Sequence, residues 1–491
     1  MTGWTHLANE LLYAIFNFLP NSDLKSIRLT CKFLSVVTPV RLNRVFISPF
    51  KRDLDTLRSI ASHPVFCSQV TEIIWDDRCL HLDDHRIISG TRYDDLSSNG
   101  ITSFKKTLAD VAEVTCLALW SGCLREYPYG ENGDLSEWER LHHLLIRLYY
   151  EQQSTLESYE DVDTFRFALQ AFPRLRRATI AGNCQTNSGQ PHRYKTPLMR
   201  SLPPWLMERW PCRFTYFCGA YNPPLRGYYA AIRELSRSSS HSVSEFVVEP
   251  THHGIDYAEN FKLFSSPNEH LTSFIAKSSL TTLEYTLNPC SRKSSHGFWY
   301  WTTNAKEIFK MTLSATKTLE HFSLNTNLMP SRGYLDSQVS LLEILPVQHW
   351  RALRSFSLLG FILTLKDTVL LLSALPATVT SLKFHQTFFS DSSWENALAC
   401  IGDRLRWSSN PDTMPTLTVS LRARHPFRTI VLCDDLTRFF EGRADNPFTV
   451  EDNTNDDYDG SFAWPCPRTR ADGVRPGFGM INDEFDDWDD V

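Results

Sequence analysis

Hydrophobic positions near the N-terminus follow helical spacing. Leu11, Ile15 and Leu19 recur at every fourth residue, and Pro20 ends that pattern. A second apolar stripe advances by three, four and three residues and consists of Leu24, Ile27, Cys31 and Leu34. A third short helix is expected from Pro39 toward Phe46. Three short helices enclose little volume, so such a unit exposes apolar surface unless another molecule covers it.

From about residue 70 onward a second pattern of three hydrophobic residues recurs. Two residues of any type separate the first from the second, and one separates the second from the third. Alternation over the last positions is typical of a β-strand. The copies are Val70-Ile73-Trp75, Val114-Leu117-Leu119, Leu175-Ala178-Ile180, Val243-Phe246-Val248, Leu319-Phe322-Leu324, Leu353-Phe356-Leu358 and Val379-Leu382-Phe384, with Leu283-Tyr285-Leu287 as a degenerate copy.

Helical apolar stretches precede several copies and end at Pro173, Pro346 and Pro376. A helix followed by a short strand, repeated, is the unit of a solenoid whose strands line its concave face. The later copies start 36, 34 and 26 residues apart, whereas regular leucine-rich repeats take roughly 20–29 residues. The sequence therefore predicts an irregular α/β solenoid with insertions. The alternative is an unrelated α/β domain whose strands share the pattern by coincidence.

Composition changes toward the C-terminus. From Ala444 to Val491 there are thirteen Asp/Glu and three Arg, so this segment carries a charge of −10 within a chain of −6, and the remainder carries +4. Few aliphatic residues interrupt it, which predicts a largely disordered acidic tail. Two aromatic interruptions, Phe462–Pro465 and Phe485–Trp488, are expected to pack back on the solenoid or to bind a partner.

Other functional classes lack sequence support. The mildly basic body holds no dense Lys/Arg block, so no nucleic acid is expected as a partner. No run approaches the roughly 18 apolar residues that a membrane span needs, and the N-terminus lacks the pattern of a secretory signal. The 12 cysteines form no clustered framework, which is typical of reduced thiols in the cytoplasm or nucleus.

Catalytic motifs are also absent from the sequence. It contains no phosphate-cradling glycine loop, no Gly-x-Ser-x-Gly elbow, no Cys-x-x-Cys pair and no His-Glu-x-x-His. Cys79, His81 and His85 lie close together, as do His142-His143 and His252-His253, but none has a matching second pair. We therefore expect a non-catalytic protein with no cofactor and no metal.

The N-terminal residues carry a specific resemblance. The segments that resemble the F-box family are Leu7–Leu12, Ile15, Phe18-Leu19-Pro20, Asp23-Leu24, Ile27 and Thr30–Leu34. That family reads Leu-Pro-x-Glu-Leu-Leu, then Ile, Leu-Pro, Asp-Leu, a hydrophobe and a Cys-Lys/Arg pair. Ala8 departs from the pattern, since the family usually has proline there. The segment Arg41–Ser48 resembles the link to a first strand in fungal F-box proteins.

The resemblance implies a function. It suggests that the protein docks on a Skp-type adaptor, and through it on a cullin–RING scaffold, as the substrate-recognition subunit of a ubiquitin ligase. The adaptor-facing positions carried over from the family are Leu7, Glu10, Leu11, Ile15, Leu19, Leu24, Ile27 and Cys31. A non-degradative scaffold is the alternative. The ordinary interpretation of the apolar positions is that they only hold a helical hairpin together.

These interpretations divide the chain into three parts. We expect an F-box over residues 1–48, a divergent leucine-rich-repeat-like solenoid that binds a client protein over 49–440, and the acidic tail over 441–491. Interface hot spots are enriched in Trp, Tyr and Arg. The densest aromatic run is the candidate client-binding site and consists of Phe298, Trp299, Tyr300 and Trp301.

Overall fold

A computed structural model describes most of the chain. The described residues are 7–77, 79, 135–181, 194–202, 226–238, 241–249, 269–287, 303–326, 340–405, 407, 414–422, 428–448, 474 and 479–483. The expected strand at Val114–Leu119, the aromatic run Phe298–Trp301 and both aromatic interruptions of the tail lie outside these residues.

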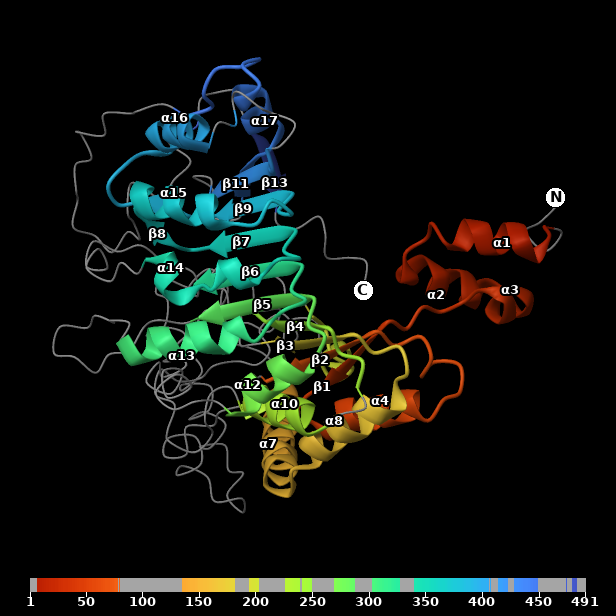
Figure 1. Ribbon diagram of the computed structural model, residues 1–491. Coiled ribbons are helices and arrows are strands. Elements are labelled where there is room, and N and C mark those ends of the chain that lie inside the picture. The colour runs from red at the N-terminus through yellow and green to blue at the C-terminus, as the bar shows by residue number, and fades with distance from the viewer. Residues whose placement is uncertain are drawn as a thin grey trace.

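The described elements alternate between helices and strands along most of the chain (Figure 1). The helices are α1 (Asn9–Phe16), α2 (Asn21–Thr30), α3 (Lys32–Val37), α4 (Lys51–Ala61), α7 (Leu135–Ser158), α8 (Glu160–Ala171), η2 (Met199–Ser201), α10 (Arg226–Arg237), α12 (Glu269–Lys277), α13 (Thr303–Ser314), α14 (Leu341–Ile344), η4 (Val347–His349), α15 (Leu365–Ala374), α16 (Trp394–Leu405) and α17 (Asp434–Phe440). The strands are β1 (Arg44–Ile47), β2 (Glu72–Asp76), β3 (Arg177–Ala181), β4 (Glu245–Val248), β5 (Thr282–Leu287), β6 (His321–Thr326), β7 (Ser355–Leu359), β8 (Ile362–Leu363), β9 (Ser381–His385), β10 (Phe388–Phe389), β11 (Thr416–Arg422), β12 (Arg428–Leu432) and β13 (Met480–Asp483).

One large sheet organises these elements. Its order is β1-β2-β3-β4-β5-β6-β7-β9-β11-β12-β13, so the strands follow each other in space as they do along the chain. Neighbours from β1 to β11 are parallel, and β12 and β13 close the sheet in antiparallel pairing. The short strands β8 and β10 form a separate parallel pair. The predicted α/β fold is confirmed at this level, as a mixed structure built on a mostly parallel sheet.

The repeated sequence pattern marks the strands. Each of its described copies coincides with a strand, namely β2, β3, β4, β5, β6, β7 and β9. Alternate strand residues such as Phe246, Phe322 and Phe356 belong to one continuous buried core beneath the helices. Helices α13 to α16 stack along one side of the sheet in Figure 1. The intervening strand residues point to the opposite side, which we call the open face.

The first three helices form a small unit that lies beside the sheet in Figure 1, here called the N-terminal bundle. Its own core holds Leu12, Phe16, Leu24 and Leu34. The expected continuous second stripe is broken at Cys31, whose backbone is extended (φ −158°, ψ 162°) and whose sulfur accepts a hydrogen bond from Leu34 N at 3.5 Å. Two helices therefore replace one.

The expected third helix from Pro39 toward Phe46 was wrong. Residues Arg44–Ile47 form β1, which pairs with β2 in the main sheet. Val45 and Ile47 enter the main core, whereas Phe46 packs on the open face. All three side chains are buried, but on alternate faces of the sheet, which a strand allows because its neighbouring residues point to opposite faces. The main sheet thus begins inside the range expected for the F-box.

Part of the expected disordered tail belongs to the fold. The segment from Glu441 to Phe448 continues from α17, and Phe448 stacks on Trp394 at 5.8 Å between ring centroids. An isolated bridge joins Phe448 to Val474. Met480–Asp483 forms β13 at the edge of the sheet. Phe448, Val474 and β13 therefore contact the main array. The composition averaged over the whole tail does not reveal these local contacts.

Candidate functional site

The N-terminal bundle exposes an unusual amount of apolar surface. Seven of the fourteen exposed large hydrophobic side chains among the described residues lie between Leu7 and Val36. They are Leu7, Leu11, Tyr13, Phe18, Leu29, Phe33 and Val36. Phe18 is 90% exposed and Leu29 is 88% exposed. Exposed apolar groups gathered on so small a unit are typical of a surface that another protein covers.

The eight positions expected to face an adaptor do not all lie on this surface. Leu7, Glu10, Leu11 and Cys31 are exposed and Ile15 is half-buried, while Leu19 and Ile27 are half-buried against the bundle core. Leu24 is different: it is 0% exposed, because it fills the space between the short helices. Its inclusion among the surface positions was wrong, and it acts in this structure by holding the bundle together.

Backbone geometry shows why Ala8 can stand where the family pattern has proline. Ala8 precedes α1 with φ −62° and ψ 145°, and its carbonyl accepts from Leu11 N and Leu12 N at 3.1 Å. A proline ring holds φ near −65°. Ala8 therefore adopts the conformation that a proline would impose, but without covalent restraint.

A short link ties the bundle to the sheet. The Asn21 side chain donates to Arg41 O at 2.9 Å and accepts from Arg41 N at 3.2 Å. Arg41 also donates to Phe16 O, and Leu42 N donates to the Gln69 side chain at 3.1 Å. These contacts hold the chain between the bundle and β1 in a defined path.

The open face of the sheet is the second candidate surface, and its first strands carry paired charges. Arg44 lies 2.7 Å from Glu72, and Arg177 lies within 3.2–3.4 Å of Glu72, Glu245 and Glu284. Burial lowers the pKa of Arg177, but the neighbouring carboxylates outweigh it and raise that pKa above its ordinary value. The charged side chains named on this half of the face are therefore paired with one another.

The chain itself covers part of that half. Tyr194 packs against Phe46 with ring centroids 6.3 Å apart, and its hydroxyl donates to Glu249 at 2.7 Å. Leu198 N donates to Asp53 at 2.7 Å, at the start of α4. The segment of residues 194–202 therefore lies over the first strands.

The later strands carry hydroxyl groups with a single lysine among them. Parallel register places Lys383 between Ser357 and Thr418, and His385 between Leu359 and Ser420. His385 Nδ1 shares a hydrogen bond with the Ser420 hydroxyl. Burial, assisted by Lys383, lowers the pKa of His385 to about 4, so the ring is neutral near pH 7. This part of the open face suits polar contacts and not hydrophobic burial.

A buried polar cluster near the start of α10 escaped sequence reasoning. Asp77 accepts a hydrogen bond from Gly227 N at 2.9 Å, and Arg226 pairs with Asp161. Burial raises the pKa of Asp77 to about 7 and that of the Cys79 thiol well above its ordinary value. A thiol held protonated is a poor nucleophile, so the cluster fits a structural role.

Neither a metal site nor a membrane span stands out in the described residues. Within them, no three His, Cys, Asp or Glu side chains gather as metal ligands would. None of their helices combines the length and the hydropathy that crossing a membrane requires.

Comparisons with known proteins do not assign this chain to a family. No protein-family model matches the chain, and no curated protein matches its sequence.

Proposed function

We propose that this protein is a substrate-recognition subunit of a Skp–cullin–F-box type ubiquitin ligase. In this role the N-terminal bundle acts as an F-box that docks on the Skp adaptor. The array of strands and helices acts as a leucine-rich-repeat-like receptor for a client protein. The chain supplies proximity and orientation, while the recruited ligase subunits supply the bond-making groups.

The exposed apolar surface of the bundle is the observation that carries the proposal. Leu7 and Leu11 coincide with positions where the F-box pattern has hydrophobes, and both side chains are exposed, at 40% and 55%. The small core beneath them involves other residues. A unit that keeps apolar groups outside while filling its own interior is suited to docking.

The order of the main sheet supports the receptor part. Strands that stack in chain order, with a helix between most neighbours, generate an extended array in which each unit contacts mainly its neighbours. Such arrays present one long strand-lined surface to partners. We propose that a client is contacted on the open face of the later strands, where Lys383 is exposed and Thr418 is half-buried.

Adaptor binding tests this function. Replacing Leu11 by Asp places a charge in the proposed apolar interface, so we expect the full-length variant to lose co-purification with a Skp-type adaptor by tenfold or more. Leu11 is largely outside the bundle core, so the variant should keep its helices. Pull-down with purified adaptor, together with circular dichroism, measures both.

Met311→Asp is the matched control, because Met311 on α13 is also 55% exposed but lies on the main array. It should leave adaptor binding unchanged. Equal binding by wild type and Leu11→Asp would contradict the proposed docking surface. A version of the protein that lacks residues 1–40 keeps β1, and stabilisation of client proteins in cells that express only this version would separate a ligase receptor from a non-degradative scaffold.

A further inference from the structure

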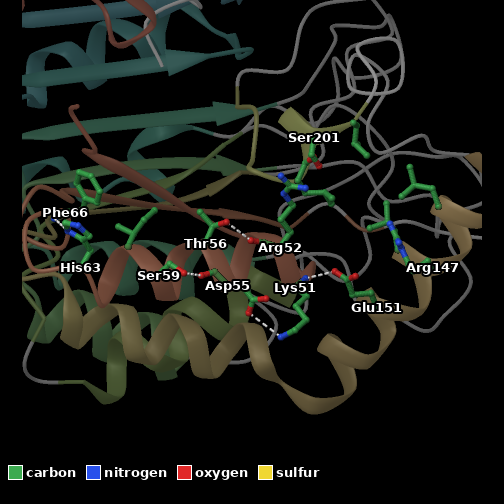
Figure 2. Close-up of a pocket in the computed structure, with 15 residues that line it drawn as sticks. Lys51, Arg52, Asp55, Thr56, Ser59, His63, Phe66, Arg147, Glu151 and Ser201 are labelled. Carbon is green, nitrogen blue, oxygen red and sulfur yellow. Dashed lines mark hydrogen bonds and ion pairs between the residues drawn. The ribbon is translucent and has the colours of Figure 1, made fainter. Parts of the chain in front are cut away.

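A groove runs between α4, α7 and η2, at the end of the array where the sheet begins. Its volume is about 810 Å³. Figure 2 shows His63 and Phe66 at one end of it, and Arg147 with Glu151 at the other. Pockets of roughly 300–1,000 Å³ are typical of binding sites, so the groove is large enough to hold a ligand.

The spacing of the lining residues shows that the groove follows α4. Every fourth residue from Lys51 onward lines the groove, namely Lys51, Asp55, Ser59 and His63. A helical rise of 1.5 Å per residue makes this stripe roughly 16–18 Å long. An extended peptide covers that length in about five residues.

Two arginines in the groove have no carboxylate partner among the residues that the structure describes. Arg52 on α4 and Arg147 on α7 both line it and are exposed. Nearby cations contrast with them: Lys51 lies 3.3 Å from Asp55, and Arg58 pairs with Glu160.

The carboxylates of the groove are engaged elsewhere. Asp55 pairs with Lys51, and Glu151 accepts a hydrogen bond from Lys51 N at 2.7 Å. Neither lies within ion-pair distance of Arg52 or Arg147 in the described structure. Without an ion-pair partner among the described residues, the two guanidinium groups each offer a fork of donors that suits a carboxylate or a phosphate.

The remainder of the groove is mixed apolar and aromatic. Leu148, Leu198 and Leu202 are buried and line it, so they give it an apolar base. At the far end His63 stacks on Phe66 with ring centroids 4.2 Å apart. His63 Nδ1 accepts from Val65 N and Phe66 N, which leaves Nε2 to carry a proton and donate.

We infer that this groove binds a short segment of a partner protein that carries an acidic or phosphorylated side chain about five residues from an apolar one. Arg52 and Arg147 provide the donors for the anionic group, the apolar base lies beneath the segment, and the His63–Phe66 pair holds its far end. Charge complementarity selects an anionic partner, and the length of the groove favours a peptide segment over a compact ion. If the proposed function holds, this segment belongs to the client. Peptide binding itself does not depend on adaptor docking.

The test uses the full-length protein and fluorescent peptide libraries. Each library fixes one central position as phosphoserine, glutamate, alanine or lysine, with an aromatic residue five positions away, and binding is measured by fluorescence anisotropy. We expect the phosphoserine or glutamate library to bind best. The Arg52→Ala/Arg147→Ala double variant should weaken that binding at least tenfold.

Arg174→Ala is the matched control, since Arg174 is exposed but does not line the groove. It should bind the libraries as wild type does. Equal binding of all libraries, equal binding by the double variant, or no peptide binding at all would each overturn the inference. Binding of inorganic phosphate alone, lost in the double variant, would assign the groove to a small anion instead. Adaptor co-purification should be unchanged by both arginine substitutions, so failure here is distinct from failure of the proposed function.

Discussion

Asp53 shows how one residue can connect distant parts of this chain. Its carboxylate accepts from the Ser48 hydroxyl at 2.6 Å and from Leu198 N at 2.7 Å, and its side chain is 0% exposed. Burial raises the pKa of Asp53 from 3.8 to about 6, although these hydrogen bonds oppose the change. Asp53 therefore holds the segment that lies over the first strands, at the cost of burying a charge.

This raised pKa makes the contribution of Asp53 depend on pH. Between about pH 3.8 and 6 the folded protein binds more protons at this site than the unfolded chain, so the free energy of unfolding falls as the pH rises. Asp53→Asn keeps an acceptor for Leu198 N without the charge. We expect the wild type to lose stability relative to Asp53→Asn as the pH rises from 4 to 7, by up to about 3 kcal/mol. Chemical denaturation of both proteins across this range measures the difference. A difference that does not vary with pH would contradict the assignment.

Among the elements, β13 decides how the sheet ends. It pairs antiparallel with β12, and Gly479 before it has φ +81° and donates to Asp435 at 2.7 Å. A Cβ at Gly479 would lie 2.4 Å from Ile430 Cγ2, so this close approach requires glycine. The strand thus covers the edge of β12 and is locked to α17 by one hydrogen bond.

Removal of β13 should loosen its neighbour. In a chain that lacks residues 479–491, β12 becomes an edge strand and loses the hydrogen bonds that β13 supplied. We expect those amides of Arg428–Val431 that point to β13 to exchange with deuterium about tenfold faster or more. A chain that lacks only residues 484–491 keeps β13 and should exchange as the full-length protein does. Unchanged exchange in the shorter chain would show that β13 adds nothing to the sheet.

At the scale of the whole molecule, the N-terminal bundle and the main array have separate hydrophobic cores among the described residues. The N-terminal bundle has its own core of four buried residues, and the main array has one continuous core from β1 to α17. Buried residues of the two do not belong to one cluster. The bundle should therefore lose its structure without unfolding the array, as a docking module joined by a short link would.

Phe16→Ala tests this independence. Phe16 is 0% exposed, and truncation of a buried phenylalanine costs roughly 3–5 kcal/mol, which so small a core cannot absorb. We expect loss of protection in α1–α3 with unchanged hydrogen exchange in β5–β7. Phe322→Ala in the main core should show the opposite pattern. Loss of protection in both parts of the Phe16→Ala protein would mean that they fold as one unit.

Much of the array was predictable because strand alternation is a local property. The repeated pattern located β2 to β7 and β9. The same pattern at Met414, Leu417 and Val419 could have located β11, which was missed. The break at Cys31 and the strand Arg44–Ile47 were mistaken for helix, because short apolar runs satisfy either periodicity until a partner strand decides.

The sequence by itself determined the spacing of the apolar residues, and with it the α/β character, the small N-terminal bundle and the faces of most strands. Only the tertiary structure decided that Leu24 is buried while Leu11 is exposed. It also decided that residues 194–202 lie over the first strands and that Arg52 and Arg147 line one groove. Alternation and helical spacing act over a few residues. The contact of Asp53 with Leu198 and the shared groove of Arg52 and Arg147 instead bring together residues about a hundred or more positions apart. Such residues come close only once the sheet has assembled.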